Sequence, residues 1–243
     1  MTRRRFFAPP SAFDLSKRSV TLTADEARHL REVLRLKPGD EVSVFDGAGK
    51  EFRARVAQAR RESAELDLDQ EIEPARPESP LQITLAVALL KGEKFDLVVQ
   101  KATELGVMKI VPLITRYADI KLRDESDASK RVARWQRIAL EAAKQSGRAV
   151  VPTIENPTPF KSVLGPSNPC LLFSEKSGHG LTQIDTDSVT AIVGSEGGWS
   201  DEELEEARAA GAQIVTLGGR ILRAETAAIT VAALLQHRFG DLK

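Results

Sequence analysis

The sequence predicts an α/β fold with a mostly parallel sheet, preceded by a small domain that resembles a β-barrel. Three observations lead to this prediction. Short strands and one helix fill the first 72 residues, the segment 73–80 (EPARPESP) holds three prolines in eight residues, and apolar strands alternate with amphipathic helices from residue 81 onward. The proline-rich segment has no periodicity, so we place a boundary there between domains spanning 1–73 and 81–243.

In the first predicted domain, residues 23–35 (TADEARHLREVLR) have the spacing of an amphipathic helix, and Thr23 can cap it. Glycine-containing turns at 37–40 and 46–49 separate the strands that follow. The stretch SAELDLDQEI at 63–72 alternates apolar and polar residues, as a half-buried strand does. One helix among several short strands is typical of a small barrel-like module.

The second predicted domain opens with a continuous apolar run, LQITLAVALL at 81–90, which is typical of a strand buried on both faces. An amphipathic helix follows and ends at Gly106. Further along, Ser200 is a candidate N-cap for a helix whose first turn is acidic. The other predicted strands are 108–115, 169–175, 188–194 and 212–218, and the predicted helices are 94–106, 128–147, 200–211 and 224–239.

The predicted C-terminal helix, Ala224 to Phe239, is apolar nearly all round, so we expect it to be buried on most sides. Small residues such as Ala228 and Ala232 permit another surface to approach closely. We therefore place part of a dimer interface on this helix.

The composition limits the class of protein. The 243 residues include 35 basic and 35 acidic side chains, so net charge argues neither for nor against a nucleic-acid partner. Residues 1–61, however, hold 14 Lys and Arg against 8 Asp and Glu, which favours a basic face on the first domain. The single cysteine, Cys170, rules out an internal disulfide and a multi-cysteine metal site, and we expect no metal.

No apolar run reaches the roughly 18 residues that a membrane span needs. The first ten residues, MTRRRFFAPP, are basic but lack an apolar signal core. We therefore expect a cytoplasmic protein without a membrane partner.

Glycine-bearing loops follow three of the predicted strands: FSEKSGHG at 173–180, GSEGGWS at 194–200 and LGGRILR at 217–223. In an open parallel sheet, ligands bind beyond the carboxyl ends of the strands, and glycines let the backbone approach a ligand closely. One such loop is often only a turn. Three together, with Arg220 and Arg223 in the last, favour one composite binding pocket.

Common nucleotide and hydrolase motifs are missing. The first strand of the α/β part is not followed by the G-x-G-x-x-G of a dinucleotide-binding fold, and GSEGG is not the G-x-S-x-G of a hydrolase. The histidines form no metal motif. We favour structural roles for His29 and His237 on helices and leave His179, in a glycine loop, open between structure and function.

Several longer motifs also carry a resemblance. The stretches RRFF, HLREVLRLKPGD, KGEKFDLVVQKATELGV, EAAKQSGR, VGSEGG and LGGRILRAETA occur in this order, from about residue 4 to 242. Together they resemble the RsmE family of 16S ribosomal RNA (uracil-N3) methyltransferases, of the SPOUT superfamily. The resemblance implies an N-terminal PUA-like RNA-binding barrel and a C-terminal domain with a deep trefoil knot. It also implies S-adenosylmethionine as methyl donor and a homodimer.

The resemblance assigns the three glycine loops to the cofactor. The implied cofactor-binding residues are Leu172, Phe173, Ser174, Gly194, Ser195, Glu196, Gly197, Gly198, Leu217, Gly218, Ile221, Leu222, Arg223, Thr226 and Ala227. One residue departs from the family pattern, because Ser195 stands where the family usually has proline. Proline would restrict the unfolded chain, so serine is expected to make this loop softer.

Arg223 and Glu196 are the catalytic candidates. Uracil N3 must lose its proton before it can attack the sulfonium methyl group, and a guanidinium beside the base favours the anion. Glu196 and Glu225 begin segments that lead into helices, so stabilisation of the helix dipole is an equally open role for both.

Five basic residues are candidates for contacts to RNA: Arg3, Arg4, Arg5, Lys91 and Arg148. A frayed basic terminus or a solvated surface would explain the same residues without RNA.

Two functions of different classes remain. The first is methylation of N3 of a specific uridine in 16S rRNA of the small ribosomal subunit. The second is a non-catalytic RNA-binding assembly factor that retains the fold. The intact glycine loops favour the enzyme, because a factor that only binds RNA needs no cofactor pocket.

Overall fold

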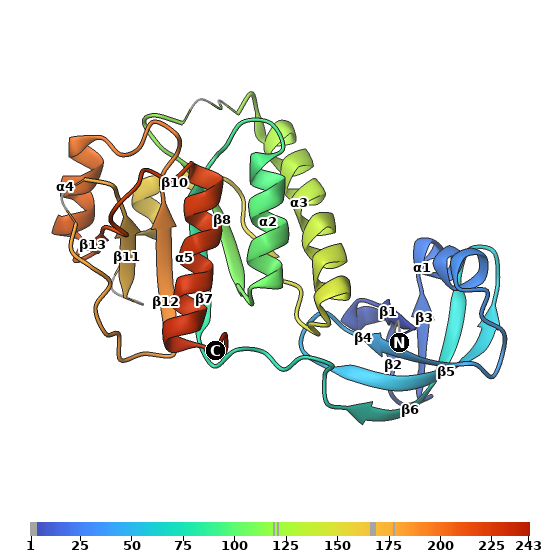
Figure 1. The fold of residues 1–243 in the computed structure, drawn as a ribbon. Coiled ribbons are helices and arrows are strands. Elements are labelled where there is room, and N and C mark those ends of the chain that lie inside the picture. The colour runs from blue at the N-terminus through green and yellow to red at the C-terminus, as the bar shows by residue number, and fades with distance from the viewer. Residues whose placement is uncertain (1–3, 119, 121, 166–168, 177) are drawn as a thin grey trace. The chain divides into compact units, whose positions relative to one another are not determined.

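The structure is a computed structural model that describes residues 4–118, 120, 122–165, 169–176 and 178–243. The chain divides into two compact units. The first comprises Met1–Glu78 together with Ala143–Val151, and the second comprises Ser79–Ala142 together with Pro152–Lys243 (Figure 1). Each unit has its own sheet.

The first unit is built on a curled six-stranded sheet in the order β1-β4-β5-β6-β3-β2. Its strands are β1 (Arg5–Phe7), β2 (Phe13–Asp14), β3 (Ser19–Leu22), β4 (Glu41–Phe45), β5 (Glu51–Ala59) and β6 (Ala64–Ile72). The β1 and β4 strands pair in parallel and the remaining pairs are antiparallel. The concave face closes over a core that includes Phe6, Leu30, Val44 and Leu66.

The helix predicted over residues 23–35 is shorter and less regular than expected. An α-helix, α1 (Ala24–Arg28), continues as a π-helical turn over His29–Val33. Thr23 occupies the N-cap position, but its side chain makes no capping hydrogen bond, so the cap prediction is wrong. The ring of His29 lies edge-on to Phe6, with the ring centroids 6.0 Å apart, which fits a structural role.

The segment 143–151 belongs to the first unit through backbone pairing. The Val151 N–H donates to the carbonyl of Gly47 at 2.9 Å, and the Gly49 N–H donates to the carbonyl of Ala149 at 3.2 Å. This segment is 65 or more residues away from the rest of the unit along the chain, and no local pattern in it indicates a strand partner.

The second unit contains a parallel sheet in the order β10-β8-β7-β12-β11-β13, with β9 paired to β8. Its strands are β7 (Gln82–Ala88), β8 (Lys109–Ile114), β9 (Thr153–Ile154), β10 (Thr158–Pro159), β11 (Cys170–Phe173), β12 (Ser188–Val193) and β13 (Gln213–Val215). All of the pairs in this sheet are parallel. The apolar β7 and β12 lie in its centre, as their unbroken hydrophobicity predicts.

The helices of the second unit are α2 (Lys94–Glu104), α3 (Glu125–Ser146), α4 (Asp201–Ala209) and α5 (Ala224–Phe239). Helices α2 and α5 pack against each other, and α5 also packs on β7 and β12 (Figure 1). Helix α4 and the 3-10 turn at 160–163 share a core with Ala86, Leu172 and Ile192. The sheet is therefore covered by helical structure along both faces.

The sheet order brings β12, β11 and β13 side by side. Because the three strands are parallel, the loops that follow them leave the same edge of the sheet. These are the three glycine-bearing loops of the sequence.

Candidate active site

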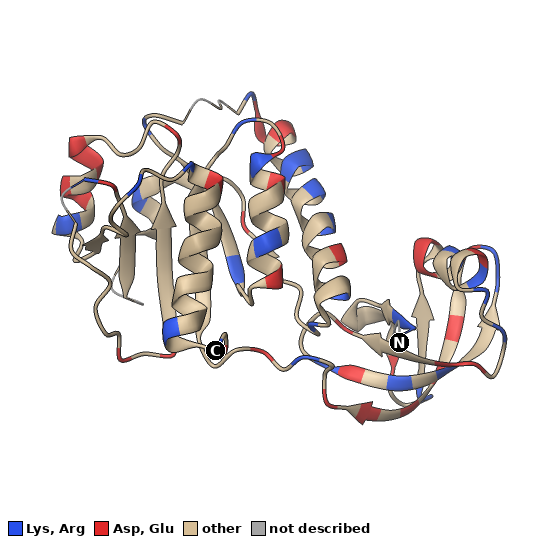
Figure 2. Cartoon of the chain, in the orientation of Figure 1, with Lys and Arg blue, Asp and Glu red and all other residues tan. Residues whose placement is uncertain are grey.

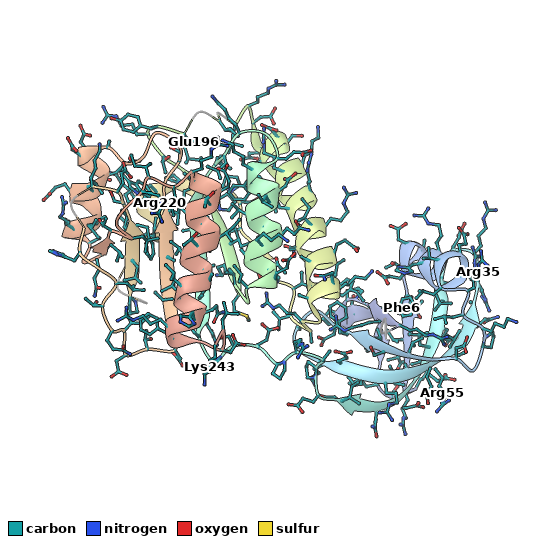
Figure 3. All side chains as sticks on the ribbon, viewed as in Figure 1. Phe6, Arg35, Arg55, Glu196, Arg220 and Lys243 are labelled. Atoms are coloured by element: carbon teal, nitrogen blue, oxygen red, sulfur yellow. The ribbon has the colours of Figure 1, made fainter. Side chains whose placement is uncertain are left out.

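A cavity of about 430 Å³ lies at the edge of the sheet where these three loops meet. Its wall is largely apolar. The charged side chains in the wall are Glu175, Glu196, Arg220 and Arg223. Figure 3 shows Glu196 and Arg220 on loops at the same end of the second unit. The lining residues are Phe173, Ser174, Glu175, Val193, Gly194, Ser195, Glu196, Gly198, Trp199, Val215, Thr216, Leu217, Gly218, Gly219, Arg220, Ile221, Leu222, Arg223, Ala224 and Ala227.

One wall of the cavity is formed by Trp199. Its indole Nε1 donates to the carbonyl of Phe173 at 2.9 Å, and its ring packs on Phe160. A Cβ atom at Gly194 would lie 3.1 Å from the indole ring. The glycine therefore lets the end of β12 approach the tryptophan closely.

The loop after β12 is a tight turn held by its own backbone and by Tyr117. The Gly198 N–H donates to the carbonyl of Ser195 at 3.0 Å, and the Ser195 hydroxyl donates to the carbonyl of Tyr117 at 3.0 Å. A Cβ atom at Gly197 would lie 2.7 Å from the Cβ of Tyr117. The serine that replaces the family's proline thus fastens the loop through a hydrogen bond, which offsets the softness expected from the sequence.

The loop after β13 exposes its side chains around two glycines. Gly218 and Gly219 have φ angles of +75° and +69°, a region that favours glycine. Ile221 is 85% exposed. The guanidinium groups of Arg220 and Arg223 are exposed and make no hydrogen bond or ion pair with any residue that the structure describes.

An ion-pair cluster lies beside the cavity. The Lys94 ammonium donates to Glu196 Oε1 at 2.7 Å and lies 4.0 Å from Glu225 Oε2. The hydrogen bond to Glu196 raises the pKa of Lys94 above its usual value of 10.5, while the nearby charge of Arg223 opposes this shift. The sequence did not single out Lys94, because a lysine at the start of an amphipathic helix is usually a solvated residue.

The cavity contains most of the predicted cofactor-binding residues. Twelve of the fifteen line it. The other three do not: Leu172 is buried within β11, Gly197 faces Tyr117, and Thr226 is exposed on α5. The lining residues absent from the predicted cofactor-binding set include Glu175, Trp199 and Arg220; each stands directly beside a predicted residue, namely Ser174, Gly198 and Ile221.

Two of the predicted RNA contacts are wrong, because their guanidinium groups are buried in ion pairs. Arg5 is 7% exposed and pairs with Glu51 at 3.1 Å, while Arg148 is 4% exposed and pairs with Glu78 at 2.6 Å. A basic residue in a sequence indicates charge but not exposure.

The other three candidates differ in position. Arg4 is exposed and lies 3.5 Å from Asp40, and Lys91 is exposed in the turn between β7 and α2. Arg3 lies outside the described residues.

His179 has a backbone role. Its N–H donates to the carbonyl of Ile214 at 3.0 Å and its carbonyl accepts from Thr216 at 2.9 Å, so the loop after β11 pairs with β13. On the last helix, His237 Nδ1 lies 2.8 Å from the Leu242 carbonyl.

Within the part of the chain that the structure describes, no three His, Cys, Asp or Glu side chains gather as metal ligands would. None of the helices in that part is both long enough and apolar enough to cross a membrane.

Comparison with known families identifies both units. Residues 77–236 match a family described as an RNA methyltransferase domain, and residues 22–69 match one described as an RNA methyltransferase PUA domain. The ribosomal RNA small subunit methyltransferase E of Synechocystis sp. is 37% identical over 237 residues, which cover 93% of this chain and 75% of the relative. The protein of the same name from Rickettsia conorii is 34% identical over 223 residues, 88% of each chain.

Solved structures show the same architecture. A ribosomal RNA small subunit methyltransferase E from Neisseria gonorrhoeae, bound to S-adenosyl methionine, is 37% identical, with a TM-score of 0.88 over 99% of this chain and 100% of that one. A methyltransferase from Legionella pneumophila in complex with the same cofactor is 31% identical, with a TM-score of 0.90 over 100% of both chains. These similarities, with the parallel sheet and the curled N-terminal sheet, confirm the predicted fold class.

Proposed function

Because the chain belongs to the ribosomal RNA small subunit methyltransferase E family, we propose that it transfers a methyl group from S-adenosylmethionine to N3 of a specific uridine in 16S rRNA. The observation that carries this proposal is the glycine-lined cavity with the exposed, unpaired guanidinium of Arg223 at its wall. A cavity of this size can hold a small-molecule cofactor, and the arginine at its wall is placed to meet a second ligand.

The cavity fits S-adenosylmethionine in size and chemistry. Its volume of about 430 Å³ is in the range of small-molecule sites. The amide groups of Gly219, Ile221 and Leu222 donate no hydrogen bond to another described residue, so they can bind the polar edge of an adenine. When bound, the cofactor supplies a methyl group on a positively charged sulfur.

We assign to Arg223 the role of binding the target base. Its guanidinium would hydrogen-bond the uracil carbonyl oxygens and stabilise the negative charge that develops as N3 loses its proton. An unpaired, exposed arginine is available for this role, since no carboxylate among the described residues neutralises it. The cavity would also hold N3 in line with the methyl group.

We assign to Glu196 the role of accepting the N3 proton of the target base. It lines the cavity, and its side chain is 30% exposed, so its carboxylate can reach both a bound base and water. The N3 proton would pass first to the Glu196 carboxylate, and the N3 anion would then take the methyl group, with the electron pair of the former carbon–sulfur bond left on sulfur.

The PUA-like unit is assigned to the RNA outside the cavity, with Arg4 as one contact. We further propose a homodimer through α5, whose Leu234 is 38% exposed, and a cytoplasmic site of action, where small-subunit RNA is found.

Mass mapping of small-subunit RNA, incubated with and without the protein and cofactor, tests this function. The expected result is one methyl group gained on the Watson–Crick edge of a single uridine. Calorimetry with S-adenosylmethionine separates the alternative: an RNA-binding factor without activity would bind RNA but not the cofactor at millimolar concentration.

A further inference from the structure

Lys94 is a charged residue beside the cavity to which the proposed function gives no role. We propose that Lys94 is a positioning residue, which holds the Glu196 carboxylate at the cavity so that it can accept the proton of the target base. This inference rests on the proposed function and adds a residue to it.

The geometry of the cluster joins three elements. Lys94 is the first residue of α2, Glu196 follows β12, and Glu225 lies in the first turn of α5. The single ammonium lies 2.7 Å from Glu196 Oε1 and 4.0 Å from Glu225 Oε2. Glu196 lines the cavity, so the lysine fixes a cavity residue from outside.

The position of Lys94 is not explained by helix stability. A cation in the first turn of a helix opposes the helix dipole, which favours negative charge there. Two carboxylates from other elements supply the favourable interaction instead. Lys94 is therefore unfavourable for the helix itself, and its interaction with the two carboxylates offsets this cost.

The backbone that carries Lys94 is well anchored. In the same first turn of α2, Asp96 accepts a hydrogen bond from the Trp135 indole at 3.0 Å, and the rings of Phe95 and Trp135 have centroids 4.3 Å apart. Both α3 contacts restrain the start of α2. The backbone of Lys94 is thus held in place, so its ammonium group can restrain Glu196 in the loop after β12.

Glu225 gives the ammonium a second partner. Its Oε2 atom is buried and has no hydrogen-bond partner among the described residues, and the side chain is 12% exposed. A buried carboxylate oxygen without a hydrogen bond depends on a nearby cation. The charged groups facing Lys94 are therefore Glu196, Glu225 and, with the opposite effect, Arg223.

The bridge persists at neutral pH. The hydrogen bond to Glu196 raises the pKa of Lys94, so the contribution of the charged ammonium to stability is fully present below its ordinary pKa of 10.5. That contribution is lost only as the pH rises through the raised value. The ion pair between Lys94 and Glu196 is therefore charged on the lysine side throughout the neutral range.

The consequence concerns proton transfer. The N3 proton moves to Glu196 before the N3–methyl bond forms, and the carboxyl group then releases the proton to water. A carboxylate displaced by about 1 Å can cost on the order of 10²-fold in rate, since proton transfer requires hydrogen-bond distance. Lys94 acts by keeping Glu196 at that distance.

The test compares Lys94→Met and Lys94→Arg with the unmodified enzyme. Lys101→Met is the matched control, because Lys101 lies on the same helix, is 38% exposed against 36% for Lys94, and pairs with Glu104 on its own helix. Single-turnover methyl transfer to small-subunit RNA is measured against pH with saturating RNA and cofactor. Cofactor affinity is measured by calorimetry, and Glu225→Gln is a second, isosteric variant.

Lys94→Met should lower the single-turnover rate by about 10- to 100-fold, with cofactor affinity changed less than about 3-fold. The loss relative to the unmodified enzyme should persist across neutral pH and shrink only as the pH rises above 10.5, where the unmodified Lys94 ammonium loses its own charge. Lys94→Arg should restore most of the rate, Glu225→Gln should give a smaller loss, and Lys101→Met should match the unmodified enzyme.

A normal rate and profile in Lys94→Met, or a loss no larger than in Lys101→Met, would overturn the inference and leave the proposed function intact. A loss explained wholly by weaker cofactor binding would overturn it as well. If Lys94→Met fails to fold, Glu225→Gln decides: an unchanged rate and profile in that variant would contradict the role. No methyl transfer by the unmodified enzyme would instead overturn the proposed function.

Discussion

At the scale of single residues, the candidate site combines groups that stabilise the fold with groups that do not. Trp199 and Ser195 make buried hydrogen bonds to the backbone, and they hold the loops in place. Arg223, by contrast, is exposed and unpaired among the described residues. An arginine that lines a cavity and pairs with no described residue is expected to bind a ligand.

Arg223→Ala should lower turnover by about 10²–10³-fold, because one preorganised donor to the developing anion is lost. Arg223→Lys should recover only part of the rate, since lysine lacks the planar fork. Higher pH should recover some activity in the alanine variant by ionising uracil without help. Single-turnover pH profiles measure this; a higher KM for RNA with an unchanged plateau would show that Arg223 only binds phosphate.

Two glycines of the loops around the cavity, Gly197 and Gly218, should respond differently to the same substitution. Gly197→Ala places a methyl group 2.7 Å from the Tyr117 Cβ and should displace that loop, whereas Gly218→Ala meets no atom within 4 Å but requires a φ of +75°. The second change should cost about 1 kcal/mol of stability through backbone strain. Thermal unfolding and cofactor calorimetry separate them: we expect weakened cofactor binding in both, and normal binding in Gly197→Ala would contradict our placement of the loop.

At the scale of elements, the first turn of α4 holds the end of the loop 194–199 in place through a cap that neighbouring residues form. Ser200 and Glu203 form a reciprocal capping box, as the serine followed three residues later by glutamate indicates. Glu203 also accepts a hydrogen bond from the Arg116 N–H at 2.9 Å, which ties α4 to the end of β8. Figure 2 shows the acidic residues gathered on α4.

Ser200→Ala should lower the free energy of unfolding by about 1 kcal/mol through loss of the cap. Because Ser200 follows the loop 194–199 directly, cofactor affinity should fall slightly as well. Denaturant unfolding with and without S-adenosylmethionine measures both effects. Ser188→Ala, at the start of β12 away from the cavity, is the control; equal stability of both variants would show that the cap contributes little.

At the scale of the whole molecule, the first unit depends on residues that are far apart in the chain. Arg5 donates to both oxygens of Glu51, at 3.1 Å each, and to the carbonyl of Arg148 at 2.8 Å. Its guanidinium carbon also lies 3.9 Å from the centre of the Phe45 ring. One buried arginine therefore joins the sheet to the segment 143–151.

Arg5→Ala should destabilise the protein by about 3–5 kcal/mol, because it leaves the fully buried Glu51 without its cation. The neighbouring Arg4→Ala should leave stability within about 0.5 kcal/mol of the unmodified protein. Because Arg4 is exposed, Arg4→Ala should instead lower the affinity for RNA and flatten the salt dependence of binding. Thermal unfolding and RNA titrations at several salt concentrations measure the contrast; a stable Arg5→Ala variant would contradict the structural role.

The longer helices and strands of the second unit, and the position of its cavity, follow from local sequence patterns. Helix and strand periodicity, the glycines after β11, β12 and β13, and the capping box of α4 are all encoded within a few neighbouring residues. The order of the motifs, from about residue 4 to 242, also indicated the family that the comparisons confirm.

Which charged residues are buried, and which of them form ion pairs, became visible only in the folded chain. Arg5 and Glu51 are 46 positions apart, and Lys94 and Glu196 are 102 apart. Nothing local distinguishes Arg5, buried among carboxylate and carbonyl oxygens, from Arg4, which is exposed beside it. Solvation and ion pairing depend on which distant segments the fold brings together, so they appear only when the sheets and loops have assembled.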